Sequence, residues 1–495
     1  MGKKSKPQRP SGDDAVAAES AAAEAEKLLA RGEELLDEDA SAALSALSEA
    51  VLKLPTRQQA WYHRGVAAAE LWEDSDEPDT KAQLLETSMA SFRQVLRLDT
   101  SRRGELRYLA AIASGRLLGQ AAAGIERRAE EEDDRGGLPF LVPGTWPALA
   151  QPLLVEASQN FEEAARLVRE WGHPELGSDV LGAWGEVLAL QMRRTAAEAE
   201  LAAGSTSAPW AWADSKLLAA TWGLCEAAAD KFSSSAQGET SESEVDDLRW
   251  MTLHVEHLLS FVELARRALV TAPTGTYVSE DWASKATAAW RAAVRLATAS
   301  ALLAETSCWE AEALRGDALA AGCELLGAAG VSRLRVPTVQ AIQVETTSEL
   351  SAVSNACGEE EADKERLAFL AEEAYGKTLR RSGGAEARRT VGLALGELFL
   401  GMARGCKAQG PGDLAVEMYL QRANSAFEAV ATLCAEAPAD GDSADAEATA
   451  WYNIACAAGL AARPDQASTA LRNCFRLLHP PQRRAKWAAE ARGDP

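Results

Sequence analysis

The sequence predicts an all-α protein built from stacked pairs of helices. Alanine dominates the chain of 495 residues and aromatic residues make up only 6% of it. This composition favours helix, because alanine loses no side-chain entropy there. No alternating run of valine, isoleucine or threonine is long enough to predict a strand. Small and large apolar residues recur instead at helical spacing, in segments that come in pairs.

The clearest pair of helices lies between Ala448 and Pro480. Each helix is marked by large and small residues that share one face at the spacing of a helix. These are Trp451, Ile454 and Ala455 on the first helix and Ala467, Leu471 and Cys474 on the second. Pro464 separates the two helices and Pro480 ends the second, since proline cannot continue a helix.

This pattern of residues resembles the tetratricopeptide repeat (TPR), which spans about 34 residues. The resemblance is clear over residues 22–99 and 448–480. It implies a right-handed α-solenoid in which each repeat contacts only its neighbours. It also implies that the first helix of each pair lines a concave groove for an extended peptide or a partner helix.

Other parts of the chain carry the same pattern. Near the N-terminus, Trp61, Arg64 and Gly65 repeat the first-helix spacing, and an insertion before Ser88 predicts a lengthened second helix. The second helices of these N-terminal repeats carry Ala43/Leu47/Ala50 and Ser88/Phe92/Val95. Elsewhere the pattern rests on single triplets, namely Ala157/Phe161/Ala164, Trp184/Val187/Leu188, Trp282/Ala286/Ala289 and Ala423/Phe427/Val430. The poorest predicted helix is 336–358, which is rich in valine and threonine.

Changes in composition predict the organisation of the chain. The segments are a disordered basic tail (1–14), N-terminal TPR-like repeats (15–132), a Gly/Pro loop (133–147), helical repeats (148–232), an acidic Ser-rich linker (233–247), degenerate helical repeats (248–434), an acidic linker (435–447), and a C-terminal TPR with a capping helix (448–495). Several predicted helices are longer than a standard repeat allows.

The net charge of −23 excludes several classes of protein. A nucleic-acid binder needs Lys and Arg to displace phosphate counterions, and binding to an anionic membrane is disfavoured for the same reason.

No apolar run is long enough to span a membrane, and the N-terminus lacks the apolar core of a secretory signal. The four basic residues of the tail fit either a nuclear-import or nucleic-acid patch or, as the short run favours, a solubilising tail. None of the eight cysteines forms a C-x-x-C pair, which indicates reduced thiols in the cytoplasm or nucleus.

Residues that carry chemistry are sparse. The chain has no Walker A, nucleophile-elbow, H-E-x-x-H or dinucleotide-binding motif. His254 and His257 lie three residues apart on one helix face, a geometry that also suits an ordinary pair, and no further ligand stands nearby. We therefore expect no catalytic residue, no metal site and no cofactor, and the chain is not expected to be an enzyme.

The resemblance places candidate binding residues on the first helices. Near the N-terminus these are Gln59, Tyr62, His63, Val66 and Glu70, and near the C-terminus they are Tyr452 and Asn453. The two tyrosines fit either stacking on a bound peptide or packing against the following repeat. The short basic segment after Pro480 would act as a cap, which favours the region of Tyr62 as the main binding site.

Co-chaperone TPR domains grip a C-terminal carboxylate with Lys and Asn, and this chain departs from that pattern. The matching positions hold Leu29, Glu33 and His63. A Glu at the docking position repels a carboxylate. A carboxylate clamp is therefore disfavoured, and Asn453 alone does not restore it.

The expected function is a non-catalytic scaffold or adaptor for protein partners, favouring basic segments because the chain is acidic. The chain would be a monomer or a subunit of a hetero-complex. A second resemblance is to the nuclear TPR-like family that includes the fungal enhancer of translation termination, with a basic tail, an acidic helical body and an early acidic insertion. The alternatives are a regulator of translation termination or of a partner enzyme, a structural subunit of a larger assembly, and an enzyme subunit.

Overall fold

The structure is a computed structural model. It describes residues 12–98, 104–134, 145–171, 177–203, 215–236, 244–271, 277–303, 309–329, 334–338, 358–381, 384–409, 414–436 and 441–477. The chain divides into two compact units. Unit 1 comprises Met1–Ala123 and Pro152–Val187, and unit 2 comprises Gly124–Gln151 and Leu188–Pro495.

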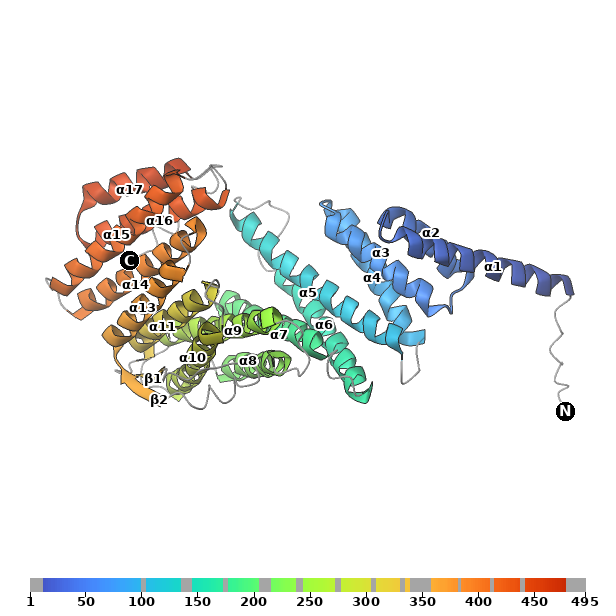
Figure 1. The fold of residues 1–495 in the computed structure, drawn as a ribbon, viewed down its shortest axis with the longest axis horizontal. Helices are drawn as coiled ribbons and strands as arrows, with labels where there is room; N and C mark the ends of the chain where they lie inside the picture. The colour runs from blue at the N-terminus through green and yellow to red at the C-terminus, as the bar shows by residue number, and fades with distance from the viewer. Residues whose placement is uncertain are drawn as a thin grey trace. The chain divides into compact units, whose positions relative to one another are not determined.

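Unit 1 begins with two consecutive helix pairs. Helix α1 (Gly12–Leu35) packs on α2 (Ala40–Lys53), and α3 (Gln58–Asp74) packs on α4 (Pro78–Leu98). Helix α2 contacts α3 and α1 touches α3, so the second pair stacks on the first (Figure 1). The predicted lengthened second helix is α4. Parts of α5 (Glu105–Asp134), α6 (Thr145–Trp171) and α7 (Gly177–Ala203) complete the unit.

Unit 2 continues the helix pairs. Its helices are α8 (Ser215–Ala236), α9 (Glu244–Thr271), α10 (Tyr277–Leu303), α11 (Glu310–Ala329), α13 (Lys364–Arg381), α14 (Ala385–Gln409), α15 (Leu414–Glu436), α16 (Gly441–Leu460) and α17 (Pro464–Leu477). The pairs are α9 with α10, α11 with α13, α14 with α15, and α16 with α17 (Figure 1). The first helices α9, α11, α14 and α16 also contact one another in that order. The all-α repeat fold predicted from the sequence is confirmed.

One short strand pair interrupts the helices of unit 2. Strands β1 (Leu334–Thr338) and β2 (Gly358–Ala362) are antiparallel, with Leu334 opposite Ala362. The predicted helix over 336–358 is therefore wrong at residues 336–338 and at residue 358. Valine and threonine favour the pleated strand. Pro337 is compatible with it because each strand of a two-stranded sheet is an edge strand, where proline is tolerated. The rest of that predicted helix lies outside the described residues.

In several helix pairs, a glycine of the first helix faces a large residue of the second. A Cβ atom on Gly65 of α3 would lie 2.6 Å from the ring of Phe92 on α4. Gly396 of α14 stands in the same way against Phe427 of α15. Further examples are Gly32 with Leu47, Gly115 with Phe161, and Gly316 with Tyr375. The missing side chain lets the ring fill the gap between the helices, as close packing requires.

Most second-helix triplets lie at the centre of their pair, although in the α17 triplet only Cys474 is buried and Ala467 and Leu471 are partly exposed. No more than 1% of the surface of Ala43, Leu47, Ala50, Ser88, Phe92, Val95, Ala157, Phe161, Ala164, Ala423, Phe427 or Val430 is exposed. The hydroxyl of Ser88 also donates a hydrogen bond of 2.8 Å to the Gly65 carbonyl. The spacing that predicted helix pairs therefore also identified their core.

Local chemistry sets where several helices begin and end. Asp39 caps α2, and its carboxylate accepts hydrogen bonds from the backbone N–H groups of Ser41 and Ala42 at 3.1 and 3.0 Å. Between α16 and α17, Ala462 adopts a left-handed φ of 55°. The N–H of Arg463 then reaches the carbonyl of Ala458 at 2.9 Å, which closes a Schellman motif.

Several helix ends differ from the predicted segments. Helix α8 runs to Ala236 and α9 begins at Glu244, so the predicted linker 233–247 is helical at both ends. Helix α16 begins at Gly441, inside the predicted linker 435–447. Helix α1 begins at Gly12, inside the predicted tail. Serine and acidic residues are favourable in the first turn of a helix, so composition alone did not separate these helix starts from linkers.

The other segment limits partly leave the described residues. Helix α5 extends to Asp134 and α6 begins at Thr145, and both ends fall inside the predicted loop 133–147. The predicted capping helix lies in residues 478–495, outside the described part of the chain.

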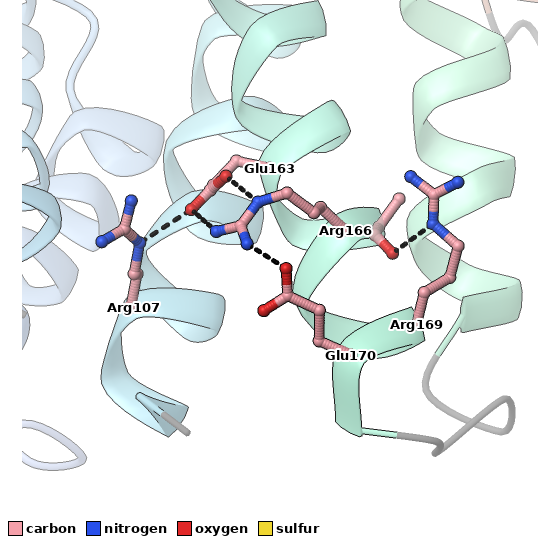
Figure 2. A network of polar contacts seen from close by, with 6 residues as sticks. Arg107, Glu163, Arg166, Arg169 and Glu170 are labelled. Carbon is pink, nitrogen blue, oxygen red and sulfur yellow. Dashed lines mark hydrogen bonds and ion pairs between the residues drawn. The ribbon is translucent and has the colours of Figure 1, made fainter. Parts of the chain in front are cut away.

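An ion-pair network joins α5 to α6 within unit 1 (Figure 2). Arg107 of α5 donates a hydrogen bond of 2.7 Å to Glu163 of α6. Arg166 donates two more to the same carboxylate, at 2.8 and 2.7 Å. Arg166 also bonds Glu170, and Arg169 donates to the Ala165 carbonyl at 3.3 Å (Figure 2). Hydrogen bonds from Arg166, and then the Arg107 guanidinium, lower the pKa of Glu163, which outweighs the opposite effect of its burial.

Glu163→Gln is expected to lower the free energy of unfolding by about 1–2 kcal/mol at pH 7, because the network is partly exposed to solvent. A carboxyl group with a lowered folded-state pKa stabilises the fold above its unfolded pKa of about 4.3 and loses this contribution as the pH falls through the folded-state pKa. The difference between Glu163→Gln and the original chain should therefore shrink below about pH 4. Urea unfolding at several pH values measures it.

The neighbouring Glu162 provides a matched control, because its side chain is exposed. Glu162→Gln should change stability by no more than about 0.5 kcal/mol. Equal effects of the two substitutions would show that the network does not hold α5 on α6.

Candidate functional site

The candidate residues near the N-terminus lie on α3. Gln59, Tyr62, His63 and Val66 are half-buried there, and Glu70 is exposed. Helix α1 lies beside them, because Nε2 of His63 is 3.1 Å from Oε1 of Glu33. We call the surface formed by Glu33, Tyr62, His63, Val66 and Glu70 the α1/α3 face.

Tyr62 packs within its own helix pair while one part of it stays exposed. Its ring centroid lies 6.1 Å from that of Phe92 on α4 and 5.3 Å from that of His63. Burial raises the pKa of the Tyr62 hydroxyl. The phenol is therefore neutral at physiological pH and keeps a hydrogen-bond donor. The ring that packs against Tyr62 belongs to the same helix pair, whereas one of the two alternatives from the sequence placed Tyr62 against the following repeat.

The electrostatics of the α1/α3 face are acidic. Burial lowers the pKa of His63 and the Glu33 carboxylate opposes this effect, so the imidazole is neutral at pH 7. Burial, and then the neighbouring Asp37, Glu73 and Asp74, raise the pKa of Glu70. Glu33 stands where the resemblance would place a clamp residue, and Leu29 is 3% exposed. This arrangement supports the expectation that a carboxylate does not dock here.

Arg64 is the basic residue in the middle of this part of α3, and its side chain bonds to neighbouring helices. Its guanidinium donates to Ser91 of α4 at 2.8 Å and to Ser48 of α2 at 3.1 Å. The same group lies 5.6 Å from the centroid of the Trp61 ring. Arg64 therefore ties α2, α3 and α4 together, and its guanidinium is engaged in these contacts.

The candidate residues near the C-terminus lie on α16, in unit 2. Tyr452 packs at the edge of a small cluster built around Ala448 and Cys474. The side-chain amide of Asn453 points to the preceding first helix and donates a hydrogen bond of 3.4 Å to Glu397 of α14. Glu397 lines a site that was not predicted from the sequence.

That site is a pocket of about 230 Å³ between α11, α13 and α14, hereafter the α11/α14 pocket. Its residues are Asp317, Ala320, Ala321, Cys323, Glu324, Lys364, Tyr375, Ala394, Glu397, Leu398, Gly401 and Met402. The buried Tyr375 donates a hydrogen bond of 2.6 Å from its hydroxyl to Asp317. The ammonium of Lys364 lies 3.5 Å from the carbonyl oxygen of Gly401.

The pocket concentrates negative charge. Burial raises the pKa of Asp317, Glu324 and Glu397, and each also lies near another acid. Arg266 lies 3.2 Å from Glu324. In the part of the chain that the structure describes, no Lys or Arg side chain pairs with Asp317 or Glu397. Glu256 of α9 also lies close enough to Asp317 for the latter to raise its pKa, which extends the acidic row to a third first helix.

A sequence signal for this pocket existed. Asp317 directly follows Gly316, and Glu397 directly follows Gly396. Those glycines face the second helix of their pair. The next residue is turned by about 100° around the helix axis, since a turn takes 3.6 residues. A Gly-acid dipeptide in a first helix therefore predicts a carboxylate beside the pair, and Val66 holds the same place after Gly65 in α3.

The histidine pair of α9 is buried. His254 and His257 are 6% and 2% exposed, and the His254 ring stacks on Phe232 at 5.8 Å. Burial lowers the pKa of His254 to about 3 and of His257 to about 4. Both rings are therefore neutral parts of the core of unit 2. Over the described ranges, no group of three or more His, Cys, Asp or Glu side chains could hold a metal ion.

Helices long and apolar enough to cross a membrane are absent from the described ranges.

Comparison with known proteins gives limited similarity. No family model matches the chain, and no curated protein matches it. Among solved structures, a circular tandem repeat protein with novel repeat topology and enhanced subunit contact surfaces matches 96% of this chain and 98% of its own at 16% identity, with a TM-score of 0.33. The P58(IPK) TPR domain matches 87% of this chain and 98% of its own at 12% identity and a TM-score of 0.16. Yeast Tom70 matches 95% of both chains at 9% identity and a TM-score of 0.17.

Proposed function

We propose that the chain is a non-catalytic interaction scaffold that holds a basic segment of a partner protein against the α1/α3 face. The observation that carries this proposal is the composition of that face. It combines a half-buried aromatic ring, Tyr62, with the carboxylates of Glu33 and Glu70, while the neighbouring Arg64 is turned into the fold. The bound segment would lie in a groove formed by the first helices.

The chemistry of the face favours a basic segment. Glu70 is exposed and surrounded by Asp37, Glu73 and Asp74, and each repels a second acid and attracts a cation. Tyr62 is half-buried and carries both an aromatic ring and a hydroxyl, which suit an interface residue that contacts apolar and polar groups. The net charge of −23 adds a long-range field that speeds the approach of basic partners.

Glu70→Lys is expected to weaken partner binding by about tenfold or more, because it places a cation where a cation should dock. Tyr62→Ala should weaken the same partner. The measurement is quantitative mass spectrometry of proteins retained by the immobilised full chain, followed by titration of the retained partner at two salt concentrations. The affinity of the original chain should fall as salt rises.

Glu428→Lys on α15 makes the same charge reversal at an exposed position in unit 2. It should leave the partner in place. Because Tyr62 packs on Phe92, the melting temperature of Tyr62→Ala must be measured in parallel, whereas Glu70→Lys alters no core contact. If neither Tyr62→Ala nor Glu70→Lys changes any partner, the assignment of the α1/α3 face is wrong.

A further inference from the structure

We propose that the α11/α14 pocket binds one basic side chain of a partner protein, that is, a single cation on an alkyl stem. The site lies in unit 2 and goes beyond the function proposed for the α1/α3 face. It is built from first helices that contact each other directly, as α1 and α3 do.

The pocket has space for such a side chain. Its volume of about 230 Å³ is many times the roughly 10–15 Å³ that a cavity needs to hold one water molecule. Gly401 stands at its wall, and a Cβ atom there would meet no other atom within 4 Å. Ala320, Ala321 and Leu398 line the same space, which gives an alkyl stem apolar surface to cover.

The charges of the pocket are unbalanced. Asp317 and Glu397 stand on α11 and α14, and no Lys or Arg of the described residues pairs with either. Neutral donors hold these carboxylates in place, namely the hydroxyl of Tyr375 for Asp317 and the amide of Asn453 for Glu397. Each carboxylate keeps further lone pairs for a ligand, because an ionised carboxylate accepts about four hydrogen bonds.

The basic residues nearby do not fill this role. The Lys364 ammonium occupies the space that Gly405 leaves free, where a Cβ atom would lie 2.5 Å from it, and it reaches the Gly401 carbonyl. Arg266 is shared between Glu263 and Glu324. Lys364 and Arg404 also act on Glu324, whose pKa burial raises and each of them lowers, so the positive charges nearby are directed to Glu324. Burial raises the pKa of Asp317 and of Glu397, and an entering cation would offset part of the cost of keeping them ionised there.

The arrangement also decides between kinds of cation. The acidic side chains do not form a group that could hold a metal ion, as far as the described residues go. An arginine or lysine can instead reach separated carboxylates, since both carry several N–H donors on a long stem. The two sources share this chemistry and are separated by the test below.

The test uses the full chain and saturation-transfer difference NMR with three small probes. These are N-acetyl-arginine methylamide, N-acetyl-lysine methylamide and the neutral N-acetyl-citrulline methylamide. At least one basic probe should receive saturation and citrulline should not. A stronger arginine signal assigns the pocket to a guanidinium, and a stronger lysine signal assigns it to an ammonium. Equal signals from citrulline and the basic probes would overturn the proposal.

Two kinds of variant locate the binding. Asp317→Asn combined with Glu397→Gln should weaken the basic probe about tenfold by removing both charges. Gly401→Leu should block the pocket while keeping the charges, and it covers the case in which the double variant is misfolded. Glu428→Gln, an exposed change on α15, is the control and should bind normally. Unchanged binding in Gly401→Leu and in the double variant would refute the site.

The same experiments test the α11/α14 pocket and the α1/α3 face separately. Glu70→Lys should leave the probe signals unchanged, because Glu70 lies in unit 1. If no probe binds but Glu70→Lys still displaces a partner, only the assignment of the α11/α14 pocket is refuted. If a probe binds but no partner responds to Glu70→Lys, only the assignment of the α1/α3 face is refuted.

Discussion

Phe427→Ala is expected to lower the free energy of unfolding of the C-terminal helix pairs by about 3–5 kcal/mol, the range for removing a buried phenylalanine. Phe427 is fully buried in a cluster with Leu420, Val430 and Ile454. Its ring fills the space beside Gly396, so truncation leaves a cavity that the backbone of α14 cannot close. Hydrogen exchange of the amides of α14, α15 and α16 measures the loss locally, which suits an array that can unfold in steps.

Leu414 provides the control on the same helix. It is 85% exposed, and Leu414→Ala should change stability by no more than about 0.5 kcal/mol. If the two substitutions in α15 cost the same, burial of the Phe427 ring does not stabilise this pair.

Much of the fold could be predicted because the core residues of a pair lie close together in the sequence, at the spacing of one helix face. The residues of a triplet such as Ala423, Phe427 and Val430 lie within seven positions of each other and share one helix face. Each pair also packs mainly against its neighbours in sequence. The second-helix triplets are therefore buried even in the middle of the chain, where the repeat signal is weakest.

Helix ends and the strand pair were harder to predict, because acidic and Ser-rich composition is ambiguous. Gly441–Ala448 contains Asp, Ser and Glu, which suit either a solvated linker or the first turns of a helix. The strand pair depends on contact between segments about twenty residues apart in sequence, β1 and β2. The local sequence pattern does not show which distant segments will pair as strands.

The α11/α14 pocket could not be predicted from one segment. Tyr375 bonds Asp317 across 58 positions in the sequence, and Asn453 bonds Glu397 across 56. The Gly-acid dipeptides give the direction of each carboxylate, but only the packing of α11 against α14 brings them to one space. The residues of the α1/α3 face were easier to propose, since one helix carries most of them.

The glycine rule makes a second strong prediction. Gly65→Leu should destabilise unit 1 by about 1–3 kcal/mol, the usual cost of overpacking. The new Cβ would meet the Phe92 ring at 2.6 Å. That ring is fully buried and lies against Tyr62, so it has little room to move. Hydrogen exchange in α3 and α4 reports the change.

A double-mutant cycle tests whether the glycine and the ring act as one unit. Phe92→Ala alone should cost about 3–5 kcal/mol, but combined with Gly65→Leu it should cost less than the sum, with a coupling of about 1–3 kcal/mol. The leucine would occupy part of the space that the ring leaves. Gly223 of α8 is the control, because it is exposed and a Cβ atom there meets nothing within 4 Å. Gly223→Leu should stabilise its helix by up to about 1 kcal/mol. Additive costs at Gly65 and Phe92 would show that the small residue is not there to admit the large one, and the packing rule for the other pairs would lose its basis.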